Sequence, residues 1–176
     1  MKKTIIVLVM VALCATVFAS VRVGANVMFG PSLKTMSSLA KEMQYKTLQK
    51  EAFKNCEVTA RLSVDIVGLD FGIEGGAVLQ EGKTIPVIRG YGCIKASILG
   101  LIEVGGGAGG RLMFTENGSY EKELYFRFSG GIKLDSLVLE GIATLPLDPN
   151  DVKSSFDFKT NADSIRLGVG LGIKIQ

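Results

Sequence analysis

Histidine and tryptophan are both absent from the 176 residues, and proline occurs only four times. Without histidine the chain lacks the side chain that most often serves as a general base and as a metal ligand. No Ser–His–Asp or Cys–His arrangement can therefore be built. We accordingly expect no catalytic residues, no metal site and no cofactor, and a protein that is not an enzyme.

Cysteine is scarce, and the charges nearly balance. Of the three cysteines, Cys14 lies in the N-terminal segment, whereas Cys56 directly precedes the second expected strand and Cys93 lies in the fourth, and these strands are not adjacent. We therefore expect free thiols rather than a disulfide bridge. Twenty Lys and Arg residues face 17 Asp and Glu residues, and this near-neutrality gives no support to nucleic-acid binding.

The N-terminus has the composition of an export signal. Lys2 and Lys3 precede an apolar run over 4–18, which ends in the small residue Ala19. The run is shorter than the ~20 residues that a spanning helix needs. A basic start, a short apolar centre and a small final residue predict a secretory signal peptide over 1–19, which leaves one domain over 20–176.

The C-terminal segment shows a strict alternation. From Ile165 to Ile175 every second residue is Ile, Leu or Val, and the residues between them are Arg166, three glycines and Lys174. Successive side chains of a strand point to opposite faces. The segment is therefore predicted to be a strand with one apolar face and one polar or empty face.

The same alternation recurs along the chain and predicts eight strands. They cover 20–30, 58–66, 69–77, 88–98, 102–114, 124–131, 137–145 and 163–176. The first, third, fifth and seventh connections are expected to be long, over 31–57, 80–86, 115–122 and 147–162, and the others to be short turns. A helix is expected from about residue 38 to residue 54, within the first connection.

An even number of strands with long loops at one end and tight turns at the other resembles the small outer-membrane barrels of the OmpA-domain and OmpX type. The resemblance covers the whole chain after residue 19 and is one of pattern. It implies an all-β, eight-stranded, antiparallel up-and-down transmembrane barrel in the outer membrane of a diderm bacterium, with a helical first outer loop. It also implies a monomer surrounded by outer-membrane lipid, with loops 31–57 and 147–162 as the sites for a surface ligand or partner.

Glycine placement favours a barrel with its polar face inside. Ten glycines lie on the charged face of the expected strands, where they leave room for long Arg and Glu side chains in a narrow lumen. Bends in a tightly coiled soluble barrel are the alternative explanation. Phe29, Phe114 and Phe126 lie toward the long-loop end, as in an aromatic girdle.

The charged residues of the inward face are the candidate site, an ion-pair network in the lumen. Pairing strands across their turns places Arg61 opposite Glu74, Lys95 opposite Glu103, Arg127 opposite Glu140, and Asp65 opposite Asp70, with Arg22 and Lys95 positioned to neutralise the two aspartates. The network is expected to contain Arg22, Arg61, Asp65, Asp70, Glu74, Arg89, Lys95, Glu103, Arg111, Arg127, Glu140, Arg166 and Lys174.

The expected helix is basic. Lys34, Lys41, Lys46, Lys50 and Lys54 outnumber Glu42 and Glu51 in its neighbourhood. Contact with anionic lipid headgroups is one interpretation, and packing of an amphipathic helix onto its own barrel is the simpler one.

Three functional hypotheses follow. The first is a non-enzymatic outer-membrane barrel with a charge-filled lumen and a structural or surface-interaction role. The second is a secreted or periplasmic lipocalin-like barrel that binds an apolar ligand inside. The third, a membrane-embedded lipid-modifying enzyme, is disfavoured by the absence of histidine.

Overall fold

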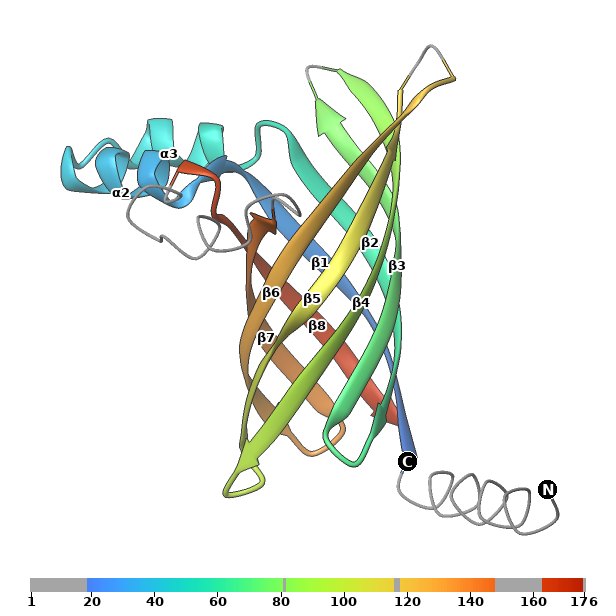
Figure 1. Ribbon diagram of the computed structural model, residues 1–176. Coiled ribbons are helices and arrows are strands. Elements are labelled where there is room, and N and C mark those ends of the chain that lie inside the picture. Colours follow the sequence, from blue (N-terminus) through green and yellow to red (C-terminus); the bar gives the residue numbers. More distant parts are fainter. Residues whose placement is uncertain (1–18, 81, 116–117, 148–162, 176) are drawn as a thin grey trace, which may run out of the picture.

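Eight antiparallel strands close into a barrel in the order in which they occur in the chain (Figure 1). The computed structural model describes residues 19–80, 82–115, 118–147 and 163–175. The strands are β1 (Ala19–Ser32), β2 (Cys56–Ile66), β3 (Leu69–Gln80), β4 (Lys83–Ile98), β5 (Ile102–Phe114), β6 (Tyr120–Leu134), β7 (Leu137–Leu147) and β8 (Arg166–Ile175). The predicted all-β, up-and-down, eight-stranded barrel is confirmed. The expected signal peptide lies outside the described residues except for Ala19, with which β1 begins.

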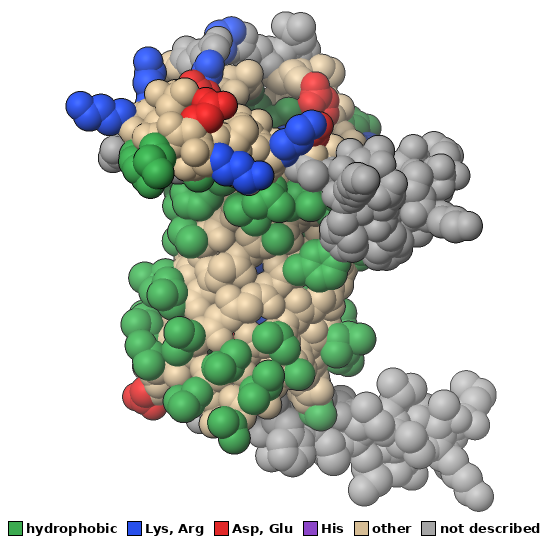
Figure 2. Space-filling model, turned by 90° about the vertical axis from the view of Figure 1, so that its left-hand side faces the viewer, with side chains coloured by type: hydrophobic (Ala, Val, Ile, Leu, Met, Phe, Trp, Pro, Cys, Tyr) green, Lys and Arg blue, Asp and Glu red, His purple; other side chains and the backbone are tan. Residues whose placement is uncertain are grey.

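Alternation along each strand places the polar side chains inside and the apolar ones outside. In β4, Arg89 is 2% exposed, whereas Ile88 beside it is 50% exposed. Each residue step of a strand turns the side chain to the other face, so one parity of each strand fills the lumen. Figure 2 shows the resulting scatter of apolar side chains over one side of the outer surface.

Short turns connect the strands at the end of the barrel where β1 begins and β8 ends (Figure 1). Val67, Leu99 and Asp135 each have a positive φ, which lets the chain reverse within two or three residues. The prediction of a long third connection over 80–86 is wrong. Gln80 pairs with Lys83, because Gly82 also takes a positive φ and makes a tight turn there.

The first connection contains two helices, α2 (Leu33–Lys41) and α3 (Tyr45–Ala52), rather than one helix over 38–54. α2 begins earlier than predicted because the Ser32 hydroxyl accepts a hydrogen bond from the Thr35 backbone N–H, 3.3 Å away. The break follows from Met43, whose φ of 55° cannot continue a right-handed helix. Both helices lie at the end opposite the short turns and project sideways from the barrel (Figure 1).

The expected loops after β5 and β7 are described only in part. β6 begins at Tyr120, four residues before its predicted start, which shortens the fifth connection to 115–119. The expected outer loop over 147–162 lies outside the described residues apart from Leu147, the last residue of β7.

β1 and β8 pair to close the ring. Their register runs from Val21 opposite Ile175 to Met28 opposite Gly168, and it shifts between Met28 and Ser32. Every other pair of neighbouring strands is adjacent in the sequence. The barrel therefore has a single seam, with an irregularity at the end where the helices leave the ring.

Inward glycines serve two purposes. A Cβ at Gly72 or Gly172 would meet the Tyr91 ring or the Arg22 and Arg61 side chains, so these glycines make room for large lumen residues. A Cβ at Gly107 would instead overlap the Gly92 carbonyl oxygen of the neighbouring strand. Such glycines allow the close backbone approach that a narrow, strongly coiled barrel requires.

We predict different effects of two Gly→Ala substitutions on the stability of the barrel. Gly107→Ala forces backbone displacement and should lower the free energy of unfolding by roughly 1–3 kcal/mol. Gly75→Ala, where no atom lies within 4 Å of the added Cβ, should be neutral or slightly stabilising, since alanine restricts the unfolded chain. Urea titration of the folded barrel, followed by gel mobility of unboiled samples, measures both. Equal destabilisation of the two variants would contradict the close approach at Gly107.

Candidate functional site: the charged lumen

The lumen holds most of the charged residues predicted to lie there. Eight of the thirteen predicted residues are buried as whole residues, and the Lys95 and Glu103 side chains are 6% and 12% exposed. The eight are Arg22, Arg61, Asp70, Glu74, Arg89, Arg111, Arg127 and Glu140. Arg166, Asp65 and Lys174 are half-buried.

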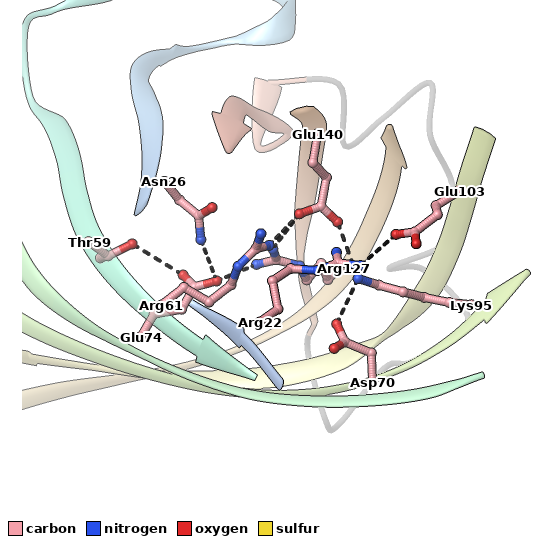
Figure 3. A network of polar contacts seen from close by, with 10 residues as sticks. All are labelled: Arg22, Asn26, Thr59, Arg61, Asp70, Glu74, Lys95, Glu103, Arg127 and Glu140. Atoms are coloured by element: carbon pink, nitrogen blue, oxygen red, sulfur yellow. Dashed lines mark hydrogen bonds and ion pairs between the residues drawn. The ribbon is translucent and has the colours of Figure 1, made fainter. Parts of the chain in front are cut away.

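Two arginines form the centre of the network (Figure 3). Arg127 on β6 donates from Nη1 to Glu74 Oε1 on β3, at 2.8 Å, and its guanidinium lies 4.2 Å from the centre of the Tyr91 ring. Arg61 on β2 forms an ion pair with Glu140 on β7. Neither pair joins neighbouring strands, so the side chains meet across the lumen.

Glu74 is also held by polar neighbours. Asn26 Nδ2 on β1 donates to Glu74 Oε1, at 2.7 Å, and the Thr59 hydroxyl donates to Oε2, at 3.4 Å. A buried carboxylate needs donors for its lone pairs as well as a counter-charge. Arg127, Asn26 and Thr59 supply both from three separate strands.

Toward the end with the short turns, two further ion pairs continue the network (Figure 3). Lys95 Nζ lies 2.8 Å from Asp70 Oδ2 and 3.6 Å from Glu140 Oε1. Arg22 Nη2 donates to Glu103 Oε2, at 2.7 Å. The proposed neutralisation of Asp70 by Lys95 is thus present, whereas Arg22 is directed to Glu103.

A second cluster occupies the end of the lumen near the helices. Arg89 approaches both carboxylate oxygens of Glu57, with Nε 2.5 Å from Oε1 and Nη2 2.8 Å from Oε2. Arg111 lies 3.0 Å from Glu57 Oε2 and donates to Glu123 Oε2, at 2.9 Å. Arg89 also lies over the Tyr125 ring, 5.4 Å from its centre.

The three remaining predicted residues lie apart from these contacts. Arg166 begins β8 at the helix end and forms no ion pair with a described residue. Asp65 Oδ1 accepts the Gly68 backbone N–H, at 3.2 Å, and so stabilises a turn. Lys174 lines a polar hollow at the short-turn end together with Asp65 and Glu103.

Two of the four predicted cross-strand oppositions are wrong. Asp65 is opposite Asp70 and Arg61 is opposite Glu74, as predicted. Lys95, however, is opposite Gly105, because Leu101 belongs to the turn and shifts the register by two residues. Arg127 is opposite Thr144 rather than Glu140, because β6 continues to Leu134 before a tight turn.

Several lumen residues lie outside the predicted set. Glu57 is 2% exposed and binds two arginines, and Glu123 binds one. Glu57 points into the lumen like Thr59, two residues further on, and Glu123 does so like Tyr125. Both glutamates directly precede the predicted start of their strand. Extending each alternation toward the N-terminus would have included them. The ring contacts of Tyr91 with Arg127 and of Tyr125 with Arg89 are also absent from the prediction.

Within the described ranges, no group of three Cys, Asp or Glu side chains could hold a metal ion. None of the described helices is long and apolar enough to cross a membrane. No protein-family model matches the sequence, and no curated protein matches it.

We predict a large cost for Arg127→Ala. The substitution leaves Glu74, rather than Glu140, without its nearest cation, and an uncompensated buried charge costs about 3–5 kcal/mol of unfolding free energy. Chemical denaturation of the refolded barrel measures the loss. Lys34→Ala is the control, because its ion pair with Asp163 is exposed and should contribute less than ~1 kcal/mol.

A double-mutant cycle tests the pairing itself. The coupling energy between Arg127 and Glu74 should exceed that between Arg127 and Glu140. The closest charged atoms are 2.8 Å apart in the first pair and 3.9 Å apart in the second. A stronger coupling of Arg127 to Glu140 would contradict the observed register.

Proposed function

We propose that this protein is a non-enzymatic outer-membrane β-barrel with a structural or surface-interaction role. The observation that carries the proposal is the inverted burial of the barrel, in which charges fill the lumen and Val, Ile, Leu and Phe cover the outside. A soluble monomer rarely exposes so many large apolar side chains on one wall after another of its surface. Lipid is the medium that such a surface fits.

Strand lengths agree with this proposal. The strands contain between 10 residues, in β8, and 16 residues, in β4. About 9–11 tilted residues suffice to cross the hydrocarbon core of a bilayer. Every strand is therefore long enough to span it, and the ends of the longer strands extend beyond.

The two ends of the barrel differ in a way that suggests an orientation. Short turns and the start of β1 lie at one end, which in barrels of this type faces the periplasm. The helices lie at the other end (Figure 1), which would face outward. Loops 31–57 and 147–162 are then the parts available to a surface ligand or partner, and the barrel anchors them as a monomer.

The contacts of the lumen support a structural rather than catalytic role. Each carboxylate of the central network lies within ion-pair distance of Arg or Lys, as Glu74 does with Arg127. Groups bound to one another in this way are not directed at a substrate. This argues against the lipid-modifying enzyme.

The lipocalin-like alternative requires the apolar face to point inward around a ligand cavity. In the described strands that face points outward, and the buried side chains include Arg61, Glu74 and Arg127. The geometry therefore favours the membrane barrel over the apolar-ligand carrier.

An arginine scan of the outer face tests the lipid contact. Leu171→Arg, in the middle of the outward face of β8, should lower the stability of the barrel in vesicles by roughly 2–4 kcal/mol. Leu99→Arg, at a turn where the side chain is 91% exposed, should cost ~0–1 kcal/mol because it lies outside the hydrocarbon. Urea unfolding in phosphatidylcholine vesicles measures both. Equal, small effects would indicate that Leu171 faces water.

Cell fractionation tests the location directly. We expect the expressed protein in the outer membrane, extractable only by detergent, with a gel mobility that changes on boiling. Recovery as a soluble periplasmic protein would contradict the proposal.

The filled lumen should not conduct ions. Arg61, Glu74, Arg127 and Tyr91 occupy its middle, and an eight-stranded barrel leaves little space beyond its own side chains. In planar bilayers we expect no steady current from the wild-type barrel, under conditions in which a 16-stranded porin conducts. A steady, single-step conductance would show an open path and contradict the structural role.

A further inference from the structure

The helix pair α2–α3 has several exposed apolar side chains among the described residues. α2 has no buried residue. Met43 and Tyr45, between and within the helices, are 74% and 65% exposed, and Phe53 just after α3 is 59% exposed. Helices of eight or nine residues are marginal alone and are normally stabilised by burying an apolar face. Among the described residues the segment contacts the barrel at its base and projects sideways from there (Figure 1), so the expected packing onto its own barrel is seen only at that base.

The base of the helix pair is fixed to β1. The Phe29 and Phe53 rings meet edge to face, with their centres 6.2 Å apart. A Cβ at Gly30 would overlap the Lys54 carbonyl oxygen, so glycine is required for the returning chain to pass β1 this closely. The helices are thus attached to the rim at β1 and, through the Leu33 N–H that donates to the Ile165 carbonyl oxygen, beside the start of β8, while Met43 and Tyr45 stay exposed.

An apolar groove lies on the outer wall on the same side. It has a volume of about 460 Å³ and runs across β6, β7, β8 and β1. Gly130 and Gly141 face each other in it, and Phe128 and Phe29 border it. Phe29 therefore belongs both to the groove and to the base of the helices. Figure 2 shows this side of the barrel, with the helices above the wall.

The helix segment carries a positive net charge, which favours lipids with anionic headgroups. Residues 33–54 contain five lysines and two glutamates, a net charge of +3, and no acidic residue lies in the first turn of either helix. Lys34 is paired with Asp163, but Lys50 and Lys54 are exposed. Basic amphipathic helices that lie in a membrane interface attract anionic headgroups.

We propose that α2–α3 and the groove form a binding site for an anionic, phosphate-bearing membrane lipid. Lysines of the helix segment contact the headgroup, the exposed Met43, Tyr45 and Phe53 enter the interface, and one acyl chain lies in the groove beside Gly130 and Gly141. This inference rests on the proposed membrane location. It adds a lipid class and a place on the barrel surface.

The first test uses the absence of tryptophan. Phe53→Trp introduces the only indole of the chain, and the barrel is refolded into vesicles of phosphatidylcholine alone or of phosphatidylcholine and phosphatidylglycerol in equal amounts. In the mixed vesicles we expect blue-shifted emission and quenching by phosphatidylglycerol with brominated chains. A folded, inserted barrel whose emission is that of indole in water would overturn the proposal. Failure to insert at all would instead contradict the membrane location.

The second test fills the groove. Gly141→Leu places a side chain in it without a backbone clash, since the nearest atom to the added Cβ lies 3.6 Å away. Gly75→Leu is the matched control, because it adds the same side chain to an open site on β3. Phosphatidylglycerol retained by the purified barrel is measured by native mass spectrometry. We expect the retention of phosphatidylglycerol to fall several-fold in Gly141→Leu only. Equal retention in both variants would exclude the groove as the binding site of the acyl chain.

The third test removes charge. The double variant Lys50→Gln, Lys54→Gln should lower the preference for phosphatidylglycerol over phosphatidylcholine by about tenfold or more. The control is the double variant Lys83→Gln, Lys122→Gln, which removes the same charge at the same end of the barrel but away from the helices. It should change the preference for phosphatidylglycerol little. Equal effects of the two double variants would show general electrostatic attraction. Cross-linking of two copies through the groove in vesicles would show that a second chain occupies it, and would also overturn the lipid site.

Discussion

A carboxylate taken out of water needs a cation and hydrogen-bond donors close by, and in this barrel they come from across the lumen. The central network contains four cations, Arg22, Arg61, Lys95 and Arg127, and four anions, Asp70, Glu74, Glu103 and Glu140. Arg61 and Glu140 lie on β2 and β7, Arg127 and Glu74 on β6 and β3, and Arg22 and Glu103 on β1 and β5, so these three ion pairs connect distant parts of the ring, whereas Lys95 and Asp70 join the neighbouring strands β4 and β3. The lumen therefore acts as a polar core, and the apolar face is left for the outside.

That core determines where glycine is required. Some of the large side chains fit inside because a neighbouring inward position is glycine, as at Gly72 beside Tyr91 and at Gly172 beside Arg22. Other inward glycines, such as Gly107, let two strands come closer than a Cβ would allow. Outward glycines have a different consequence. At Gly130 and Gly141 they leave a hollow in the apolar surface, next to the point where the helix segment is attached.

The sequence predicted the strands and the direction of their faces well, because period-two alternation depends only on local geometry. It predicted ion-pair partners poorly. Parity identifies the residues that point inward, but register depends on single turn residues such as Leu101, and contacts across the lumen depend on barrel diameter and strand tilt. Glu57 was missed for a related reason, since its strand begins before the clear alternation does. The division of the helix at Met43 depends on a left-handed backbone conformation. A methionine side chain gives no indication of that conformation in the sequence.

The seam between β1 and β8 sets the order in which the ring can be completed. Seven of the eight strand pairings join segments that follow one another in the chain, so hairpins can form as soon as their strands are available. The eighth joins Val21 to Ile175 and closes a loop of almost the whole domain, which carries the largest entropic cost. The barrel therefore remains an open sheet until its last strand arrives. In that state the edges of β1 and β8 are unpaired, and the charges of the lumen still have access to water.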